Sequence, residues 1–184
     1  IGFPISDNPQ DQTKLQALNE KQLTRKVQKG INFVADNEAD SIVIYCNSLS
    51  GAIDLESLRI KNTLRIITPL DIYSEYANRY NTFGLLAANC QSTANIEKLI
   101  LSKNKNATVV GLGNLHIVHD IEEGMKSFQI IRKYRLEDIC NIFSKAGSEI
   151  IILGCTHFSI FYRDLYDLTR LRLLEPSEEM LKLI

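Results

Sequence analysis

Short runs of nearly continuous apolar residues recur along this chain, with amphipathic segments between them. The runs span residues 41–46, 64–69, 83–88, 107–112, 149–155 and 172–176. A strand that is buried on both faces has this composition, because neither face carries polar residues, and such strands belong to parallel sheets. The runs therefore predict parallel β-strands with helices packed over both faces.

The segments between the runs show helical spacing of their apolar residues. The longest, residues 15–37, places Leu23, Val27 and Ile31 on one face of a helix. Further helices are predicted over residues 54–60, 93–102, 136–146 and 176–184. Strands and helices thus alternate, which predicts an α/β fold.

The composition of the chain argues against several classes of protein. The net charge of −1 lacks the basic excess of a nucleic-acid-binding protein. No apolar run approaches the ~18 residues that a membrane span needs, and no signal peptide opens the chain. Four widely spaced cysteines without a CxxC pair favour reduced thiols over disulfides or a zinc site. We expect a cytoplasmic protein with no metal and with no nucleic-acid or membrane partner.

Two of the cysteines end similar segments. Ala39–Cys46 and Gly147–Cys155 each run from a helix end through a small and a polar residue into an apolar strand that closes on the thiol. A polar pair follows each cysteine, Asn47-Ser48 in one case and Thr156-His157 in the other. Duplication of one architecture explains this repeat, and chance similarity of two buried strands is the alternative.

Cysteines at these positions suit a particular chemistry. Ligands of parallel sheets bind outside the carboxyl ends of the strands, where Cys46 and Cys155 both lie. Racemising an amino acid requires one group to remove the α-proton and another to return a proton on the opposite face. Thiols can do either, since their pKa is about 8.5 and neighbouring groups can lower it.

The segments Ile42–Ser48 and Ile152–Phe158 resemble the two cysteine motifs of glutamate racemases, within the aspartate/glutamate racemase family. The similarity extends to residues 83–93, 120–124 and 174–179. The resemblance implies two pseudo-symmetric α/β halves, each with a mainly parallel sheet flanked by helices, and an active site in the cleft between them. We predict residues 1–74 with 172–184 as the first half and 75–171 as the second.

The resemblance also implies the chemistry and its setting. It implies a racemase that needs neither pyridoxal phosphate nor another cofactor, acts on a small amino-acid substrate and often forms a homodimer. In a bacterium such an enzyme supplies D-glutamate, a D-amino acid, for peptidoglycan and hence the cell wall. His157 follows the second Cys-Thr pair, where aspartate-type members carry Glu. The sequence therefore favours glutamate as the substrate over aspartate.

The residues that match the family's motifs take their roles from it. Cys46 is implied to remove the α-proton from one enantiomer and Cys155 from the other. His157 and Glu122 are the implied helpers of the second thiol. The predicted substrate-binding residues are Asn47, Ser48, Thr156, Gln91 and Ser92, of which Gln91 and Ser92 match a threonine-rich loop of the family.

The sequence departs from the family at its start. No DSG motif is present, and we expect that sequence upstream of Ile1 is missing. Asp7-Asn8-Pro9 is a poor counterpart of the family's PYG turn. Two alternatives therefore stay open: a related enzyme acting on another carboxylate, and a non-catalytic ligand-binding relative.

Other chemistry-bearing residues are interpreted as structural. Cys140 lies in a helical pattern and is predicted in the core, and Cys90 is also assigned a structural role. His116 and His119 lack a third ligand and are predicted to be either surface histidines or histidines satisfied by hydrogen bonds. Gly111-Leu112-Gly113 lacks the third glycine of a dinucleotide-binding loop.

Overall fold

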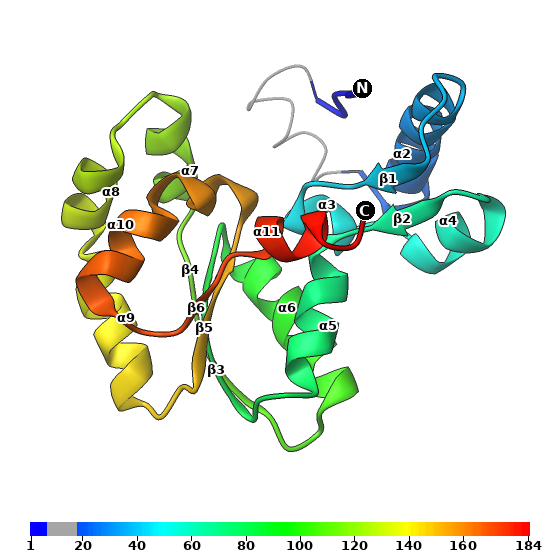
Figure 1. Cartoon of the computed structure of the whole chain (residues 1–184). Helices are drawn as coiled ribbons and strands as arrows, with labels where there is room; N and C mark the ends of the chain where they lie inside the picture. Colours follow the sequence, from blue (N-terminus) through cyan, green and yellow to red (C-terminus); the bar gives the residue numbers. More distant parts are fainter. Residues whose placement is uncertain (7–17) are drawn as a thin grey trace.

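The computed structural model describes residues 1–6 and 18–184 of the chain. Two parallel sheets, one of two strands and one of four, are flanked by helices, and the smaller sheet lies beside one end of the larger (Figure 1). Every strand pair is parallel. The predicted α/β class and the predicted parallel pairing are therefore confirmed.

The smaller unit is built around strands β1 (Ser41–Val43) and β2 (Arg65–Ile67), which pair in register. Helices α2 (Glu20–Ala35), α3 (Asn47–Ser50) and α4 (Leu55–Lys61) accompany them. Buried side chains of α2, β1, α4 and β2 form one apolar cluster. This packing holds the segment that follows β1, which carries Cys46.

The larger sheet has the strand order β4-β3-β5-β6. Its strands are β3 (Thr82–Ala87), β4 (Thr108–Gly113), β5 (Ile150–Gly154) and β6 (Leu173–Leu174). Every residue of the central strand β5 is buried, as its unbroken apolar sequence predicts. Cys155 is the first residue beyond the carboxyl end of this strand.

Helices cover both faces of the larger sheet. On one face lie α5 (Pro69–Ala77), α6 (Cys90–Lys103) and α11 (Pro176–Leu181), whose apolar residues pack with alternate residues of β3 and β5. The other face carries a second apolar cluster, to which the intervening residues of the same strands contribute their side chains. Its four helices are α7 (Leu115–Glu122), α8 (Ser127–Tyr134), α9 (Leu136–Lys145) and α10 (Ser159–Thr169).

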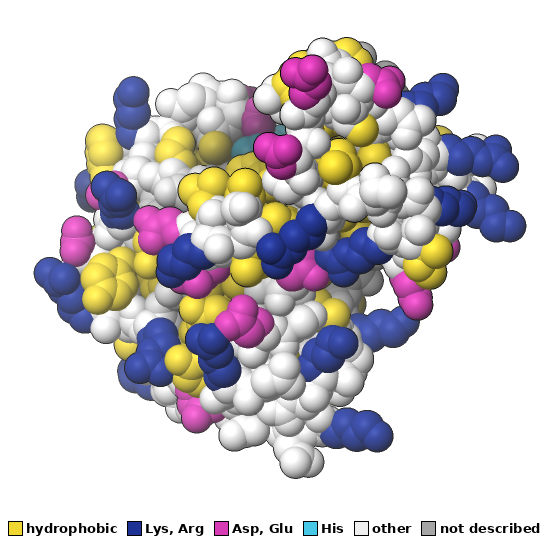
Figure 2. All heavy atoms as spheres, turned by 45° about the vertical axis from the view of Figure 1, so that its right-hand side comes forward, with side chains coloured by type: hydrophobic (Ala, Val, Ile, Leu, Met, Phe, Trp, Pro, Cys, Tyr) yellow, Lys and Arg dark blue, Asp and Glu magenta, His cyan; other side chains and the backbone are white. Residues whose placement is uncertain are grey.

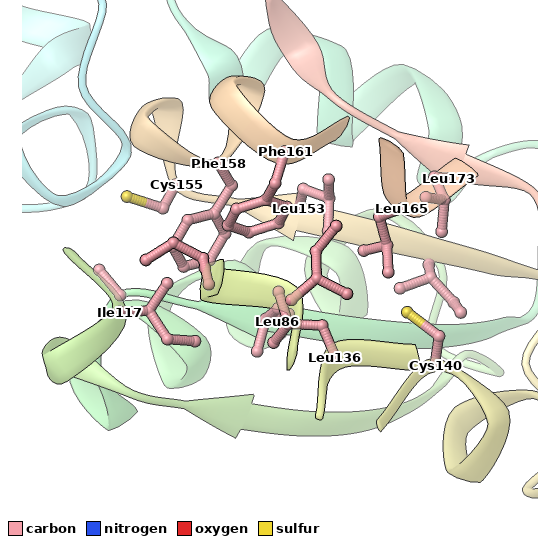
Figure 3. Packing of buried hydrophobic residues seen from close by; sticks show 14 of the residues in the cluster. Leu86, Ile117, Leu136, Cys140, Leu153, Cys155, Phe158, Phe161, Leu165 and Leu173 are labelled. Atoms are coloured by element: carbon pink, nitrogen blue, oxygen red, sulfur yellow. The ribbon is translucent and has the colours of Figure 1, made fainter. Parts of the chain in front are cut away.

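Cys140 and Cys155 lie at different places in that second cluster. Cys140 is 1% exposed and lies among aliphatic side chains, as predicted (Figure 3). Cys155 lies at the margin, beside the rings of Phe158 and Phe161, and its sulfur points away from them (Figure 3). The cluster therefore fixes the backbone of Cys155 while leaving its thiol directed outward.

The Gly111-Leu112-Gly113 segment is part of strand β4 and not a loop. A Cβ on Gly113 would lie 2.3 Å from the carbonyl carbon of Asn89 and 2.5 Å from the nitrogen of Cys90. Gly113 is thus required because the start of α6 approaches the strand closely. The close packing of α6 on β4 therefore accounts for this glycine.

The observed elements correct two boundaries of the sequence prediction. The helix predicted over residues 15–37 is α2 (Glu20–Ala35); residues 15–17 lie outside the described residues, as do Asp7-Asn8-Pro9. Residues 172–184 were assigned to the first half, but β6 pairs with β5 of the larger sheet. That assignment is wrong at the level of strand pairing, because Leu174 packs into the core of the larger sheet.

The surface carries both charge signs. Lysine and arginine side chains are interspersed with aspartate and glutamate side chains over the face drawn in Figure 2.

Across residues 1–6 and 18–184, none of the helices is both long enough and apolar enough to cross a membrane.

Candidate active site

Cys46 lies at the start of α3, just beyond strand β1. Its side chain is half-buried, and its Sγ accepts a hydrogen bond from the Leu49 backbone N–H at 3.5 Å. Burial raises the pKa of the Cys46 thiol above its ordinary 9.0, while the backbone amides of Leu49 and Ser48 act in the opposite direction.

Cys155 stands in a different environment, with an imidazole beside it. His157 lies on the short 3₁₀ turn η1 (Thr156–Phe158), which places its Nδ1 3.7 Å from Cys155 Sγ. His157 Nε2 lies 2.5 Å from Oε1 of Glu122, at the end of α7. The structure thus brings together a thiol, an imidazole and a carboxylate, with the imidazole between the other two groups.

The hydrogen-bonding roles in this line follow from the carboxylate. An ionised carboxylate can only accept, so the proton shared with Glu122 belongs to His157 Nε2. In a neutral imidazole the other ring nitrogen, Nδ1, is then an acceptor that faces the thiol of Cys155. His157 can therefore receive the thiol proton and return it.

Burial opposes the ionisation of the Cys155 thiol. The pKa of Cys155 is raised to about 12, chiefly by burial, with His157's backbone N–H lowering it and the charge of Cys46 raising it further. Both thiols are therefore held protonated in the absence of a ligand. The coupling also means that Cys46 and Cys155 lie within electrostatic reach of each other.

A cavity of about 570 Å³ joins the two neighbourhoods. Cys46 and Ser48 line it from the smaller unit, and Thr156 and His157 line it from the end of the larger sheet. The rest of its wall is largely apolar and comes from α2, β1 and residues 1–6. Cys155 is not itself among the lining residues, but Thr156 and His157, which follow it directly in the chain, face the same space as Cys46.

The predicted substrate-binding residues differ in where they lie. Asn47 is buried, and its Oδ1 accepts a hydrogen bond from the hydroxyl of Tyr73 at 2.6 Å. The hydroxyls of Ser48 and Ser92 lie 2.9 Å apart and join α3 to α6. Gln91 is exposed in the first turn of α6 and does not line the cavity, so its role stays a prediction.

The histidines and cysteines that the sequence analysis interpreted as structural do not line the cavity. His116 and His119 are exposed on α7, as predicted, and Cys90 is exposed as well. In the described part of the chain, no three His, Cys, Asp or Glu side chains are grouped so that they could hold a metal ion. Tyr73 is the residue that sequence reasoning missed, because a tyrosine within an amphipathic helix carries no signal beyond core packing.

Comparison with known proteins finds similarity to glutamate racemases. Glutamate racemase of Actinobacillus pleuropneumoniae serotype 3 is 27% identical over 132 residues, which are 70% of this chain and 49% of that protein. Glutamate racemase of Latilactobacillus sakei is 26% identical over 133 residues. The chain spans about half the length of these curated relatives.

Solved structures agree with the sequence comparison. The glutamate racemase of Francisella tularensis, solved in complex with D-glutamate, matches with a TM-score of 0.69 and 25% identity, over 90% of this chain and 63% of that one. The chain is thus similar to glutamate racemases in both sequence and fold. The Aquifex pyrophilus glutamate racemase shares the racemase fold at a TM-score of 0.65 and 20% identity, over 94% of this chain and 69% of that one. No protein-family model matches the chain.

Proposed function

We propose that this protein racemises an acidic amino acid, with glutamate favoured over aspartate, by two-base proton transfer between Cys46 and Cys155. The observation that carries the proposal is that Cys46 and His157 line one cavity and that Cys155 lies beside His157, with each cysteine just beyond the carboxyl end of a parallel strand. Two thiols approaching one small molecule from different sheets can act on opposite faces of its α-carbon.

The proposed reaction begins with a thiolate. One cysteine, as S⁻, takes the α-proton, so that the Cα–H bond breaks, an S–H bond forms and the electron pair stays on the α-carbon and its carboxylate. The other cysteine, as S–H, then donates its proton to the opposite face and becomes the thiolate. The proton count balances, and the two thiols exchange their protonation states in each turnover.

His157 supports the formation of the thiolate on one side. When Nδ1 of His157 takes the proton of Cys155, the resulting imidazolium lies between the thiolate and the carboxylate of Glu122. That arrangement compensates for the burial that otherwise keeps the thiol protonated. We assign His157 and Glu122 to proton transfer at Cys155.

Polar groups at both ends of the cavity are suited to hold the substrate. Ser48 and Thr156 line the cavity, and Asn47, which stands between Cys46 and Ser48 in the chain and is not itself a lining residue, carries an amide nitrogen with no hydrogen-bond partner among the described residues. Donors aimed at the substrate carboxylate stabilise the charge that develops there when the α-proton leaves. The preference for glutamate is supported by His157 and by the relatives named glutamate racemase, and the homodimer stays a prediction.

The test is α-proton exchange followed by NMR in deuterium oxide. The protein is incubated separately with L- and D-glutamate and with L- and D-aspartate, beside Cys46→Ala and Cys155→Ala. Cys90→Ala is the matched control, because Cys90 is an exposed thiol that does not line the cavity. We expect loss of the α-proton signal of glutamate with the parent protein and with Cys90→Ala.

The two site variants decide the mechanism. Each is expected to lower exchange by about 10²- to 10⁴-fold, the range in which positioned acid/base groups contribute. Exchange that survives either substitution in full would contradict two-base catalysis. No exchange of any of the four amino acids by the parent protein would contradict acidic amino-acid racemisation and favour another carboxylate or a binding role.

A further inference from the structure

Tyr73 of α5 is a buried polar side chain that the mechanism above does not use. Its ring and hydroxyl are 0% exposed, and the hydroxyl donates a hydrogen bond to Asn47 Oδ1 at 2.6 Å. The partner is the residue next to Cys46 and lies 26 positions away in sequence. A hydrogen bond of this length in a fully buried setting restricts both side chains.

The two partners belong to different packing units. Tyr73 lies in the apolar cluster of the larger sheet, together with Ile72 of its own helix and Phe83 of β3. Asn47 opens the short helix α3 of the smaller unit. The hydrogen bond therefore ties the segment that carries Cys46 to the core beneath the sheet that carries Cys155.

The start of α5 fixes the position of Tyr73. Pro69 is the first residue of the helix, and Asp71 Oδ2 accepts the backbone N–H of Thr68 at 2.8 Å. Both features define where the helix begins. Tyr73 follows one turn later, with its ring packed in the core, so the hydroxyl has little freedom to leave Asn47.

The hydrogen bond leaves the other end of the Asn47 amide free. Asn47 Nδ2 is buried, and it is the one buried side-chain nitrogen or oxygen in the described part of the chain that has no hydrogen-bond partner. An unpaired buried amide costs free energy unless another group completes it. With Oδ1 held by Tyr73, Asn47 cannot rotate its amide without losing that bond.

We propose that Tyr73 is a positioning residue that orients the Asn47 amide so that its Nδ2 donates to the carboxylate of the amino-acid substrate. This inference rests on the proposed function, since it assigns a role within that same site. The environment of the hydroxyl agrees with a donor role. Burial, followed by the charges of Cys155 and Glu175, raises the pKa of Tyr73 well above 10.0, which keeps the phenol protonated.

The experiment is a double-mutant cycle on the α-proton exchange of glutamate. Tyr73→Phe removes the hydroxyl and keeps the ring in the core. Tyr76→Phe is the matched control, because Tyr76 is half-buried on the same helix and its hydroxyl makes no side-chain hydrogen bond to the residues that the structure describes. We expect Tyr73→Phe to lower kcat/KM by about 10-fold, mainly through a higher KM, as loss of a ground-state contact does.

The coupling between Tyr73 and Asn47 distinguishes a positioning role of the Tyr73 hydroxyl from an effect on the stability of the fold. In an Asn47→Ala background, Tyr73→Phe is expected to change kcat/KM by less than about 2-fold, because the amide that it orients is gone. Equal losses in both backgrounds would overturn the proposal. If Tyr73→Phe does not fold, Asn47→Asp replaces it: the carboxylate still accepts from Tyr73 but loses the Nδ2 donors, and an unchanged KM would then overturn the role of Asn47 and of Tyr73 with it.

A second readout separates this inference from the proposed function. The side-chain amide signals of Asn47 in a ¹⁵N-labelled sample report the orientation of the amide without any turnover. We expect them to shift and broaden in Tyr73→Phe and to stay in place in Tyr76→Phe. A parent protein without exchange would overturn the proposed function, and unchanged Asn47 signals in Tyr73→Phe would overturn the role of Tyr73.

Discussion

The surroundings of Cys46 and Cys155 differ far more than their sequences do. Cys46 is half-buried, and a backbone amide is its closest hydrogen-bond partner. Cys155 is 7% exposed and has His157 beside it, with Glu122 behind the imidazole. The two strand ends are similar, but among the residues that the structure describes only Cys155 has a neighbouring side chain that can take its proton.

This difference indicates that the thiolates that start the two directions of the proposed reaction can form in different ways. Burial keeps both thiols protonated, and it raises the pKa of Cys155 to about 12. His157 offers a route to the thiolate at Cys155, whereas Cys46 depends on the amides of Leu49 and Ser48. The two similar strand ends therefore provide two different ways of forming the thiolate that acts as the base.

The largest effect is expected from removing the imidazole. His157→Asn should lower the rate of the direction that begins at Cys155 by about 100- to 1000-fold, because a positioned proton acceptor contributes that much. The opposite direction should lose less. Initial rates from each enantiomer of glutamate check this, with His116→Asn, an exposed histidine of α7, as the matched control. Equal losses in both directions would show that the two thiols are not distinguished by His157.

Alkylation by iodoacetamide compares the thiols directly. Only the thiolate reacts, and a raised pKa means that the thiolate forms only as the pH rises toward that pKa. Cys46, the more exposed of these two thiols, should therefore react faster than Cys155 at pH 9. The rate at Cys155 should climb ~10-fold per pH unit from 7 to 10 without a plateau, since its pKa is about 12. Peptide mass spectrometry measures each site, with exposed Cys90 as an internal reference.

A plateau at Cys155 near neutral pH would mean that His157 already holds its proton in the free protein. The same pH series in His157→Asn would then remove the plateau. Such a result would invert the comparison, because Cys155 would be the more reactive thiol.

A smaller loss is expected at the carboxylate. Glu122→Gln keeps an acceptor for His157 Nε2 but removes the negative charge that stabilises an imidazolium. Exchange that begins at Cys155 should fall by about 5-fold, with KM unchanged. Glu123→Gln, at the neighbouring exposed position, is the control. Identical rates for the two variants would remove Glu122 from the mechanism.

The smallest effect concerns the contact between α3 and α6. Ser92→Ala removes the hydroxyl that lies 2.9 Å from Ser48, and it should destabilise the fold by about 1 kcal/mol. Chemical denaturation measures this loss. Ser102→Ala is the control, because Ser102 is exposed on the same helix and bonds only to Leu99 of that helix. A loss no greater than that of the control would show that this contact does not support the Cys46 side of the site.

Several helices and strands could be predicted from the sequence because their apolar residues follow a clear local pattern. The apolar run around Ile152 predicted a fully buried parallel strand, and the strand is buried throughout. Helices α7, α8 and α10 were not predicted, since their apolar residues fall between charged ones and their stability depends on the cluster they share. The closing strand β6 was assigned to the wrong sheet because a strand of two residues carries no sign of its partner.

The sequence by itself determined the alternation of strands and helices, the place of each cysteine at a strand end and the motifs that carry the family resemblance. These depend on periodicity and on residues adjacent in the chain. Only the tertiary structure decided that Glu122 reaches His157, that Tyr73 holds Asn47 and that burial raises the pKa of both thiols. Those properties depend on the groups that surround each atom after folding, and no spacing along the chain encodes them.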